Sequence, residues 1–332
     1  MLPRRVLGRT GIEVSALGLG TAGAFAERGE EAKAVVRRAV SLGINYFDTA
    51  PVYGNASSEA VLGQALKGIE GPIVISTKLG GRPEPFDPKN ADQLRQSVEE
   101  SLAALGRNYI DILIIHEPDR PGLYDWWDDY DHFHGPVNDV LDDLKSKGLI
   151  RYTGLGGTTA YEIVPIIATG RYDVVLTACN YSALWREACI ALLPEAIRQN
   201  MGIIIGSPLQ QGWLAARYDE ALANGARRLS PPRRAQFKAL YELLDEIDIP
   251  LPELAMRWAV YSDPNISMVL TGSQSVQEIE QNVRAVEAGP LDPAVMERLQ
   301  EIADMVPFRP YEEPFVSAFR ADVPSGPGRA GR

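Results

Sequence analysis

The stretch GINYFDTAPVYGNASSEAVLG, residues 43–63, decides the fold. It opens with a short apolar run that ends at Asp48, carries Tyr53 a few residues later, and continues into a segment whose apolar residues have helical spacing. A continuous apolar run followed by a helix is typical of a strand that is buried on both faces of a parallel sheet. The stretch therefore predicts a strand and a helix of an α/β protein, with polar side chains at their junction.

The same alternation of strand and helix continues on both sides of this stretch. Strands are expected at residues 16–20, 44–48, 73–77, 110–115, 150–155, 173–177, 202–206 and 267–271. Amphipathic segments separate them, and Asn90 and Gly106 are expected to cap one of these helices. Eight strands with intervening helices predict a single (β/α)8 TIM barrel over residues 1–306. A β-hairpin at residues 4–15 is expected to cap the bottom of the barrel.

Three stretches are longer than the usual connection between a strand and a helix. Residues 117–135 follow the fourth expected strand, and residues 207–231 follow the seventh. In a barrel both loops open on the face that carries the active site, so we expect them to form walls around a substrate. The third stretch, residues 307–332, is a tail rich in proline and glycine, and we expect its end to be disordered.

Composition limits the classes of partner. The chain is 45% hydrophobic and 23% charged, as in ordinary globular proteins, and its net charge is −11. An acidic surface repels nucleic acids and anionic membranes, and no apolar run reaches the roughly 18 residues that span a bilayer. We expect a cytoplasmic protein with a small-molecule substrate, in which Cys179 and Cys189 are reduced. The oligomeric state does not follow from the sequence.

Polar residues also end the next two expected strands. Lys78 follows PIVIST, and His116 follows YIDILII. Because neighbouring parallel strands end at the same edge, Asp48, Tyr53, Lys78 and His116 are expected to converge there. A phenol has a pKa near ~10, and the ammonium of Lys78, held by Asp48, is expected to lower the pKa of Tyr53. Tyr53 would then be a general acid and base, and His116 would orient a carbonyl oxygen during carbonyl–alcohol interconversion.

A glycine motif offers a different fold. Gly18, Gly20 and Gly23 spell GxGxxG after a strand, and Asp48 ends the next strand, as in a doubly wound dinucleotide-binding domain. The helix does not start at the third glycine, however, and such a domain does not need Lys78 and His116 at further strand ends. The barrel interpretation is favoured, with the glycines allowing a tight turn at its rim.

Several motifs closely resemble the aldo-keto reductase family. They are GINYFDTAPVYGNASSEAVLG, ISTK, DILIIHEPD, LKSKGLIRYTGLGG, IIIGSPLQQGWL and VLTGSQSVQEIEQN, in order over about residues 4–290. The resemblance implies a (β/α)8 barrel that binds NAD(P)H across its C-terminal face. It implies that Tyr53 is the general acid/base, that Lys78 and Asp48 tune it, and that His116 orients the substrate.

The resemblance also implies a set of cofactor-binding residues. They are Gly20, Thr21, Asp48, Gly157, Ser207, Pro208, Leu209, Gln211, Ser273, Gln274, Glu278, Gln281 and Asn282.

The chain departs from the family where the nicotinamide is held. Glycines stand at 156, 157 and 206, and Ala178 stands where family members often have Gln. Asn180 or Trp213 are candidates to replace the missing contacts. Near Gln274 the usual Lys or Arg is absent and the first basic residue is Arg284, so NAD is expected to be preferred, with NADP possible.

These departures resemble the branch of the family that oxidises free aldoses to lactones. We therefore expect oxidation of a sugar with NAD⁺. Two alternatives stay open: a general NADPH-dependent aldehyde or ketone reductase, and a binding barrel that has lost turnover.

The aromatic loop after His116 has two interpretations. Trp126 and Trp127 are substrate candidates because they could stack on a sugar ring, or they could anchor a partly buried loop. His132 and His134 form HxH, which would suit a metal-dependent hydrolase only with more converging ligands, so no metal site is expected.

Overall fold

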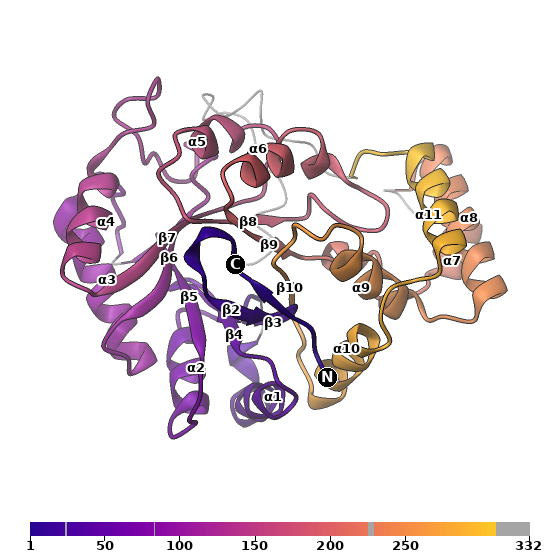
Figure 1. Cartoon of the computed structure of the whole chain (residues 1–332), viewed down its shortest axis with the longest axis horizontal. Coiled ribbons are helices and arrows are strands. Elements are labelled where there is room, and N and C mark those ends of the chain that lie inside the picture. Colours follow the sequence, from indigo (N-terminus) through magenta and orange to yellow (C-terminus); the bar gives the residue numbers. More distant parts are fainter. Residues whose placement is uncertain (24, 83, 225–228, 310–332) are drawn as a thin grey trace.

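Eight parallel strands close into a barrel in the computed structural model, which describes residues 1–23, 25–82, 84–224 and 229–309 (Figure 1). The barrel order is β10-β3-β4-β5-β6-β7-β8-β9. Each strand lies within two residues of its expected bounds, so the sequence prediction of a (β/α)8 barrel is confirmed. The strands are β3 (Leu17–Gly20), β4 (Tyr46–Asp48), β5 (Val74–Leu79), β6 (Ile110–His116), β7 (Ile150–Gly157), β8 (Val174–Ala178), β9 (Gly202–Gly206) and β10 (Met268–Thr271).

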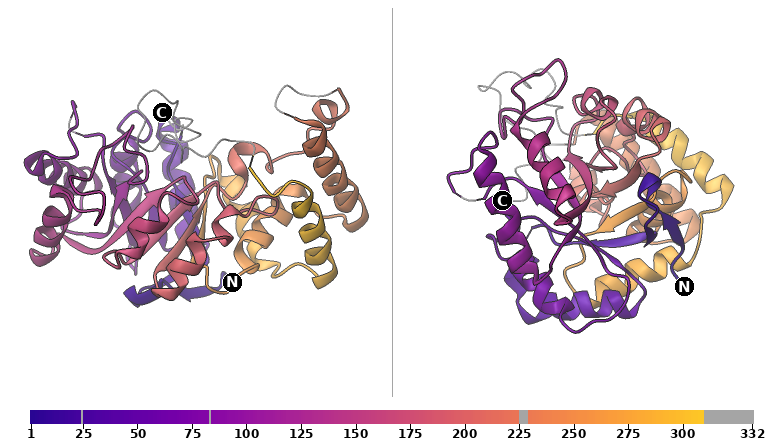
Figure 2. Two further views of the ribbon diagram at one scale, coloured as in Figure 1. Left: turned by 90° about the horizontal axis from the view of Figure 1, so that it is seen from above. Right: turned by 60° about the vertical axis from the view of Figure 1, so that its left-hand side comes forward.

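Helices surround the barrel and join its strands. The first six are α1 (Glu30–Ser41), α2 (Ser58–Leu66), α3 (Ala91–Leu105), α4 (Pro136–Ser146), α5 (Val164–Ala168) and α6 (Leu192–Arg198). The later ones are α7 (Asp219–Asn224), α8 (Pro231–Ile247), α9 (Leu251–Tyr261), α10 (Val276–Glu287) and α11 (Pro293–Met305). Asn90 caps α3 by accepting hydrogen bonds from two backbone amides, and Gly106 ends it with a φ of +63°. Figure 2 shows α8 and α11 side by side at one end of the molecule.

The hairpin closes the bottom of the barrel. Strands β1 (Arg4–Val6) and β2 (Glu13–Ser15) pair antiparallel, and Leu7 between them is fully buried. A Cβ at Gly202, where β9 begins, would lie 2.7 Å from Leu7 Cδ1, so only glycine admits this side chain. Leu7 joins an apolar cluster that fills the barrel interior: Val14, Tyr46, Val74, Ile112, Ile114, Val174, Leu176, Ile204, Met268 and Leu270. The filled interior leaves the opposite, C-terminal end of the strands for polar side chains.

The GxGxxG motif has a packing role at its first glycine. A Cβ on Gly18 would lie 2.2 Å from Met268 Cε inside the barrel, because β3 pairs directly with β10. A closed barrel has no doubly wound sheet, so the alternative of a Rossmann domain is wrong.

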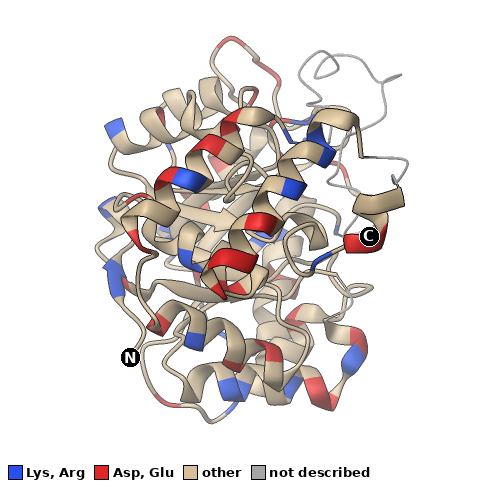
Figure 3. Cartoon of the chain, turned by 90° about the vertical axis from the view of Figure 1, so that its right-hand side faces the viewer, with Lys and Arg blue, Asp and Glu red and all other residues tan. Residues whose placement is uncertain are grey.

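The surface carries both signs of charge. Figure 3 shows acidic and basic residues interspersed along the helices of one side. In the described part of the chain, no helix is both long and apolar enough to cross a bilayer. Cys179 and Cys189 are both free thiols, although only Cys179 is buried.

The two long loops and the tail differ in how much of them is described. Residues 117–135 form a connection without helix, and residues 207–231 contain α7, which was not expected. Within the expected tail, Arg309 is buried against Glu187. Residues 310–332 lie outside the described residues, and they include residues 322–332, for which disorder was expected. The division at residue 306 stays a prediction.

Candidate active site

Lys78 and Asp48 form a buried ion pair at the C-terminal edge of the barrel. Asp48 is the last residue of β4, and Lys78 lies near the end of the adjacent strand β5. Lys78 Nζ donates to both carboxylate oxygens of Asp48 at 2.7 Å and to the carbonyl of Thr49 at 2.9 Å. Ser76 Oγ also donates to Asp48, at 2.6 Å. These bonds hold the ammonium in one place, under the loop that carries Tyr53.

Tyr53 lies between this ion pair and His116. Lys78 Nζ is 5.2 Å from the centroid of the Tyr53 ring, and the rings of Tyr53 and His116 meet edge to face with centroids 5.9 Å apart. His116 is the last residue of β6, next but one to β4 in the barrel. The structure thus brings together Asp48, Tyr53, Lys78 and His116, as the sequence predicted.

The sequence predicted that the pKa of Tyr53 is lowered, and this direction is wrong. Burial, and then the negative charges of Asp48 and Glu117, raise the pKa of Tyr53 well above its ordinary value. Because Asp48 binds Lys78 through both oxygens, the carboxylate cancels much of the field that the ammonium would exert on the phenol. Tyr53 therefore holds its proton at neutral pH, which suits a group that donates a proton to an alkoxide.

Two cavities meet at Tyr53. The larger has a volume of about 640 Å³ and extends from β3 across β10 to β9, whereas the smaller, of about 150 Å³, lies over β5, β6 and β7. Residues that line both cavities are Ala22, Tyr53, Leu176, Ala178, Ser207 and Gln211. A proton donor at such a junction can serve a carbonyl in one cavity while a hydride donor occupies the other.

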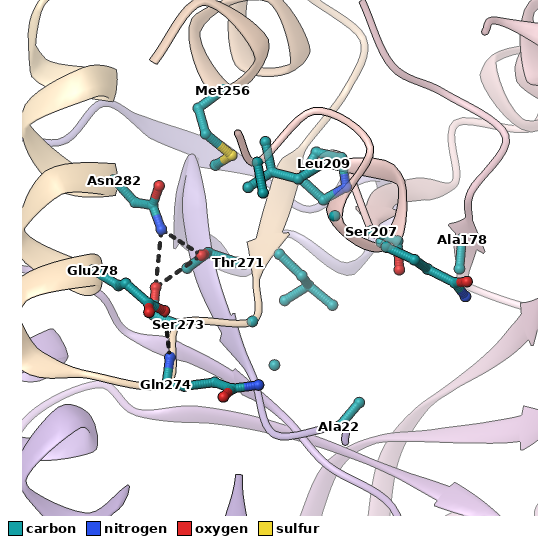
Figure 4. Close-up of a pocket in the computed structure, with 18 of the residues that line it drawn as sticks. Ala22, Ala178, Ser207, Leu209, Met256, Thr271, Ser273, Gln274, Glu278 and Asn282 are labelled. Atoms are coloured by element: carbon teal, nitrogen blue, oxygen red, sulfur yellow. Dashed lines mark hydrogen bonds between the residues drawn. The ribbon is translucent and has the colours of Figure 1, made fainter. Parts of the chain in front are cut away.

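The larger cavity gathers most of the residues expected to bind a cofactor (Figure 4). Those that line it are Gly20, Asp48, Ser207, Pro208, Leu209, Gln211, Ser273, Gln274, Glu278, Gln281 and Asn282. The amide of Asn282 donates to Thr271 Oγ1 at 2.8 Å and to Ser273 Oγ at 2.9 Å, which fixes this wall. Hydroxyl and amide groups beside an apolar floor of Leu176 and Met256 fit an extended nicotinamide dinucleotide, which needs both kinds of contact.

Two of the expected cofactor residues lie elsewhere. Thr21 is fully buried, its backbone amide donates to Asp48 O at 2.9 Å, and Ala22 lines the cavity instead. Gly157 lines the smaller cavity.

Comparisons with known proteins agree with this geometry. The model of the Aldo/keto reductase family matches residues 16–304. The chain belongs to this family. As an aldo/keto reductase it is an oxidoreductase that uses NAD(P)H.

Three similar proteins illustrate the range of the family. L-galactose dehydrogenase of Arabidopsis thaliana is 33% identical over 297 residues, which cover 85% of this chain and 87% of the relative. A probable voltage-gated potassium channel subunit beta of the same plant is 29% identical over 330 residues, covering 92% and 97%. The holo form of an aldo-keto reductase from Bacillus halodurans superposes with a TM-score of 0.74 at 26% identity, covering 93% of this chain and 99% of that one.

In this aldo/keto reductase, the pocket near Gln274 was expected to lack a cation, but the structure places one beside Gln274. Arg28, from the loop after β3, donates to Gln274 Oε1 at 3.0 Å and pairs with Glu31 at 3.2 Å. Glu278 accepts a hydrogen bond from the backbone amide of Gln274 at 2.8 Å. An acid and a cation therefore both lie at this end of the cavity, and the cation comes from a part of the chain remote in sequence.

Asp119 explains why a glycine stands at position 157, where family members often have a polar side chain. A Cβ on Gly157 would lie 2.6 Å from Asp119 Oδ1, so this carboxylate occupies the space that a side chain would need. Asp119 is itself held by the backbone amide of Thr159 at 3.0 Å and by the Thr159 hydroxyl.

Neither candidate substitute for the nicotinamide contacts is available. The Asn180 amide donates to Thr177 Oγ1 at 2.9 Å, and its oxygen accepts from Arg309. The indole of Trp213 packs against Trp185 and Phe237, with centroids 6.0 Å and 5.7 Å away. Gln211 is an amide side chain that lines both cavities.

The expected stacking of Trp126 and Trp127 on a substrate is wrong. Both indoles are almost fully buried, with 0% and 1% of their surface exposed. Trp126 Nε1 donates to the carbonyl of His116 at 3.0 Å, and Trp127 Nε1 donates to the carbonyl of Pro118 at 3.1 Å. The tryptophans anchor the loop and hold the backbone at His116, which is the other interpretation of this motif.

The HxH motif shows no metal-binding geometry. His132 Nδ1 contacts Asp129 Oδ2 at 2.7 Å, and His134 Nε2 is 3.8 Å from Asp139 Oδ1. Among the residues that the structure describes, no group of three or more histidine, cysteine or acidic side chains converges on a point.

Two polar residues of the smaller cavity were not predicted from the sequence. Glu117 and Tyr124 both line it, beside Tyr53 and His116. Glu117 directly follows His116 at a strand end, and this position is a signal that the sequence does carry. Tyr124 has no such signal, because the path of its loop decides where the ring lies.

Proposed function

We propose that this chain oxidises a free aldose to its lactone with NAD⁺. The observation that carries the proposal is the Lys78–Asp48 pair beside Tyr53 at the junction of the two cavities. The similarity to L-galactose dehydrogenase supports a sugar as substrate.

Each of the four residues has one task in this proposal. His116 orients the reacting oxygen by a hydrogen bond, and Tyr53 exchanges the proton with that oxygen. Lys78 and Asp48 fix the position and electrostatic field of the phenol. When bound, the oxidised nicotinamide ring supplies the acceptor for the hydride.

The preference for NAD⁺ is supported by the end of the larger cavity near Gln274. Glu278 places a carboxylate there, which disfavours a 2′-phosphate, and Arg28 is shared between Gln274 and Glu31. Because the Arg28 guanidinium lies beside Gln274 and could approach the 2′-phosphate, we expect NADP⁺ to bind, although more weakly than NAD⁺.

One observation favours a second candidate, a general aldehyde or ketone reductase. The raised pKa of Tyr53 keeps the phenol protonated, as the reductive direction requires. Such an enzyme would reduce simple aldehydes with NAD(P)H and ignore free sugars.

The variant Tyr53→Phe tests the proposed chemistry. We expect kcat/KM to fall by about 10²- to 10⁴-fold, because a general acid/base contributes a factor of that size. Tyr152→Phe is the matched control, since its hydroxyl bonds to the Thr10 carbonyl at 2.7 Å at the opposite end of the barrel. Unchanged turnover in Tyr53→Phe would remove the mechanism, whereas absence of turnover in the wild type would favour a binding barrel.

A further inference from the structure

Glu117 places a carboxylate in the smaller cavity, directly after His116. It is 6% exposed and lines this cavity together with Tyr53, Lys78 and His116. Its backbone has a φ of +50°, a conformation that residues other than glycine rarely adopt, and its amide donates to Gly156 O at 2.7 Å. A buried acid on a strained backbone is costly, and such features gather at sites where they serve a function.

Only one of the two carboxylate oxygens of Glu117 is engaged. Thr158 Oγ1 donates to Oε2 at 3.0 Å, and Arg120 Nε lies 3.2 Å from the same oxygen. Oε1 has no hydrogen-bond partner among the residues that the structure describes, although the side chain lines the cavity. A carboxylate only accepts hydrogen bonds, so a hydroxyl of a molecule in the cavity is a suitable partner for this oxygen.

We propose that Glu117 selects hydroxyl-bearing substrates, because its open carboxylate oxygen accepts a hydrogen bond from a substrate hydroxyl close to the reacting carbon. Arg120 and Thr158 act as positioning residues that aim this oxygen. The inference rests on the proposed sugar-oxidising function and adds the residue that distinguishes a polyhydroxylated substrate from a simple carbonyl compound.

The charges around Glu117 give this contact a pH dependence. Burial raises the pKa of Glu117 to about 7, the ion pair with Arg120 opposes the rise, and Asp119 adds to it. Lys78 from β5 also favours the charged form, while Tyr53 after β4 and Cys179 after β8 face the same carboxylate. The acceptor is therefore lost as the pH falls through about 7.

The test combines the variant Glu117→Gln with substrates that lack single hydroxyls. Wild type and variant are assayed with NAD⁺ on the best aldose and on its monodeoxy analogues, and with NADH on benzaldehyde, which carries no hydroxyl. We expect Glu117→Gln to lower kcat/KM for the aldose by about 10- to 100-fold, mainly through KM, and to leave benzaldehyde within about twofold. With the wild type, one monodeoxy analogue should have a kcat/KM that is lower than that of the aldose by a similar factor. With the variant, removal of the same hydroxyl should cause almost no further fall in kcat/KM. Below pH 7 the wild type should lose aldose activity more steeply than the variant, in which only the decline caused by protonated Tyr53 remains.

Two further variants separate a substrate contact from a structural role. Glu162→Gln is the matched control, because Glu162 is a neighbouring partly buried acid that does not line the cavity. The double variant Glu117→Gln/Arg120→Gln removes the cation that the single variant leaves buried without a counter-charge, and it should keep the same selectivity as the single variant.

The role of Glu117 would be overturned if Glu117→Gln lowered kcat/KM equally for the aldose and for benzaldehyde. It would also be overturned if every monodeoxy analogue lowered kcat/KM by the same factor in the variant as in the wild type. Failure of the wild type to oxidise any aldose would instead overturn the proposed function.

Discussion

The variant Lys78→Met probes the ion pair on which the site is built. The side chains of Lys78 and Asp48 are 2% and 5% exposed, and three hydrogen bonds hold the ammonium. Methionine fills the space of the lysine stem but leaves the Asp48 carboxylate buried without its cation. Breaking one side of a buried pair typically costs about 3–5 kcal/mol, because desolvation of the remaining charge is no longer offset. We expect the free energy of unfolding to fall by this amount.

The double variant Asp48→Asn/Lys78→Met has no buried charge at this position. Its free energy of unfolding should be at least about 2 kcal/mol higher than that of Lys78→Met, because removing both ions removes their desolvation cost. Its activity should stay about 10²- to 10⁴-fold below wild type, since Tyr53 has lost the groups that orient it. Urea unfolding followed by tryptophan fluorescence, together with kcat/KM on the same preparations, gives both quantities.

Two results would refute this reasoning. The first is a Lys78→Met variant as stable as the wild type, which would mean that the pair is solvated in solution. The second is a double variant whose loss of stability equals the sum of the losses measured for Lys78→Met and for Asp48→Asn separately, which would mean that the two side chains do not interact.

Three more predictions follow from other parts of the site. Trp126→Ala should lower the free energy of unfolding by about 3–5 kcal/mol and also lower kcat, because the buried indole holds the His116 carbonyl; a stable, fully active variant in urea unfolding and rate assays would contradict this. Because the pKa of Tyr53 is raised, log kcat/KM for alcohol oxidation should rise by about one per pH unit between pH 7.5 and 9.5, whereas carbonyl reduction should be nearly flat; a flat oxidation profile would exclude Tyr53 as the base. Arg28→Ala should weaken NADP⁺ binding by about 3- to 10-fold and change NAD⁺ binding by less than about twofold, as measured by fluorescence titration. An equal loss of affinity for both cofactors would mean that the guanidinium contacts a portion that the two cofactors share.

The barrel and the four converging polar residues were accessible from sequence for a physical reason. Strands buried on both faces need continuous apolar runs, and the chemistry of a barrel lies where those runs end. Asp48, Lys78 and His116 could therefore be placed from single strand ends. Helix α8 was not predicted, although Phe237, Leu240 and Leu244 repeat at helical spacing and would have supported it.

Other features depend on how distant segments pack, and local patterns do not encode them. Arg28 and Gln274 are 246 residues apart, so the cation near the cofactor cavity has no local signal. A loop rich in aromatic residues has the same sequence pattern whether its side chains face a ligand or the core. Trp126 is buried because Phe86 and Tyr124 pack against it, with ring centroids 5.7 Å and 5.8 Å away. The direction of the Tyr53 pKa shift followed from burial and from the geometry of the Asp48–Lys78 pair, neither of which a sequence displays.

The most direct test of the proposed function follows the absorbance of reduced nicotinamide when the protein is mixed with NAD⁺ or NADP⁺ and a panel of L- and D-aldoses at mildly alkaline pH. We predict rapid reduction of NAD⁺ with at least one aldose, slower reduction of NADP⁺, and loss of both rates in Tyr53→Phe. No reduction with any aldose, together with oxidation of NADPH by simple aldehydes, would contradict the sugar and cofactor assignments and identify a general carbonyl reductase.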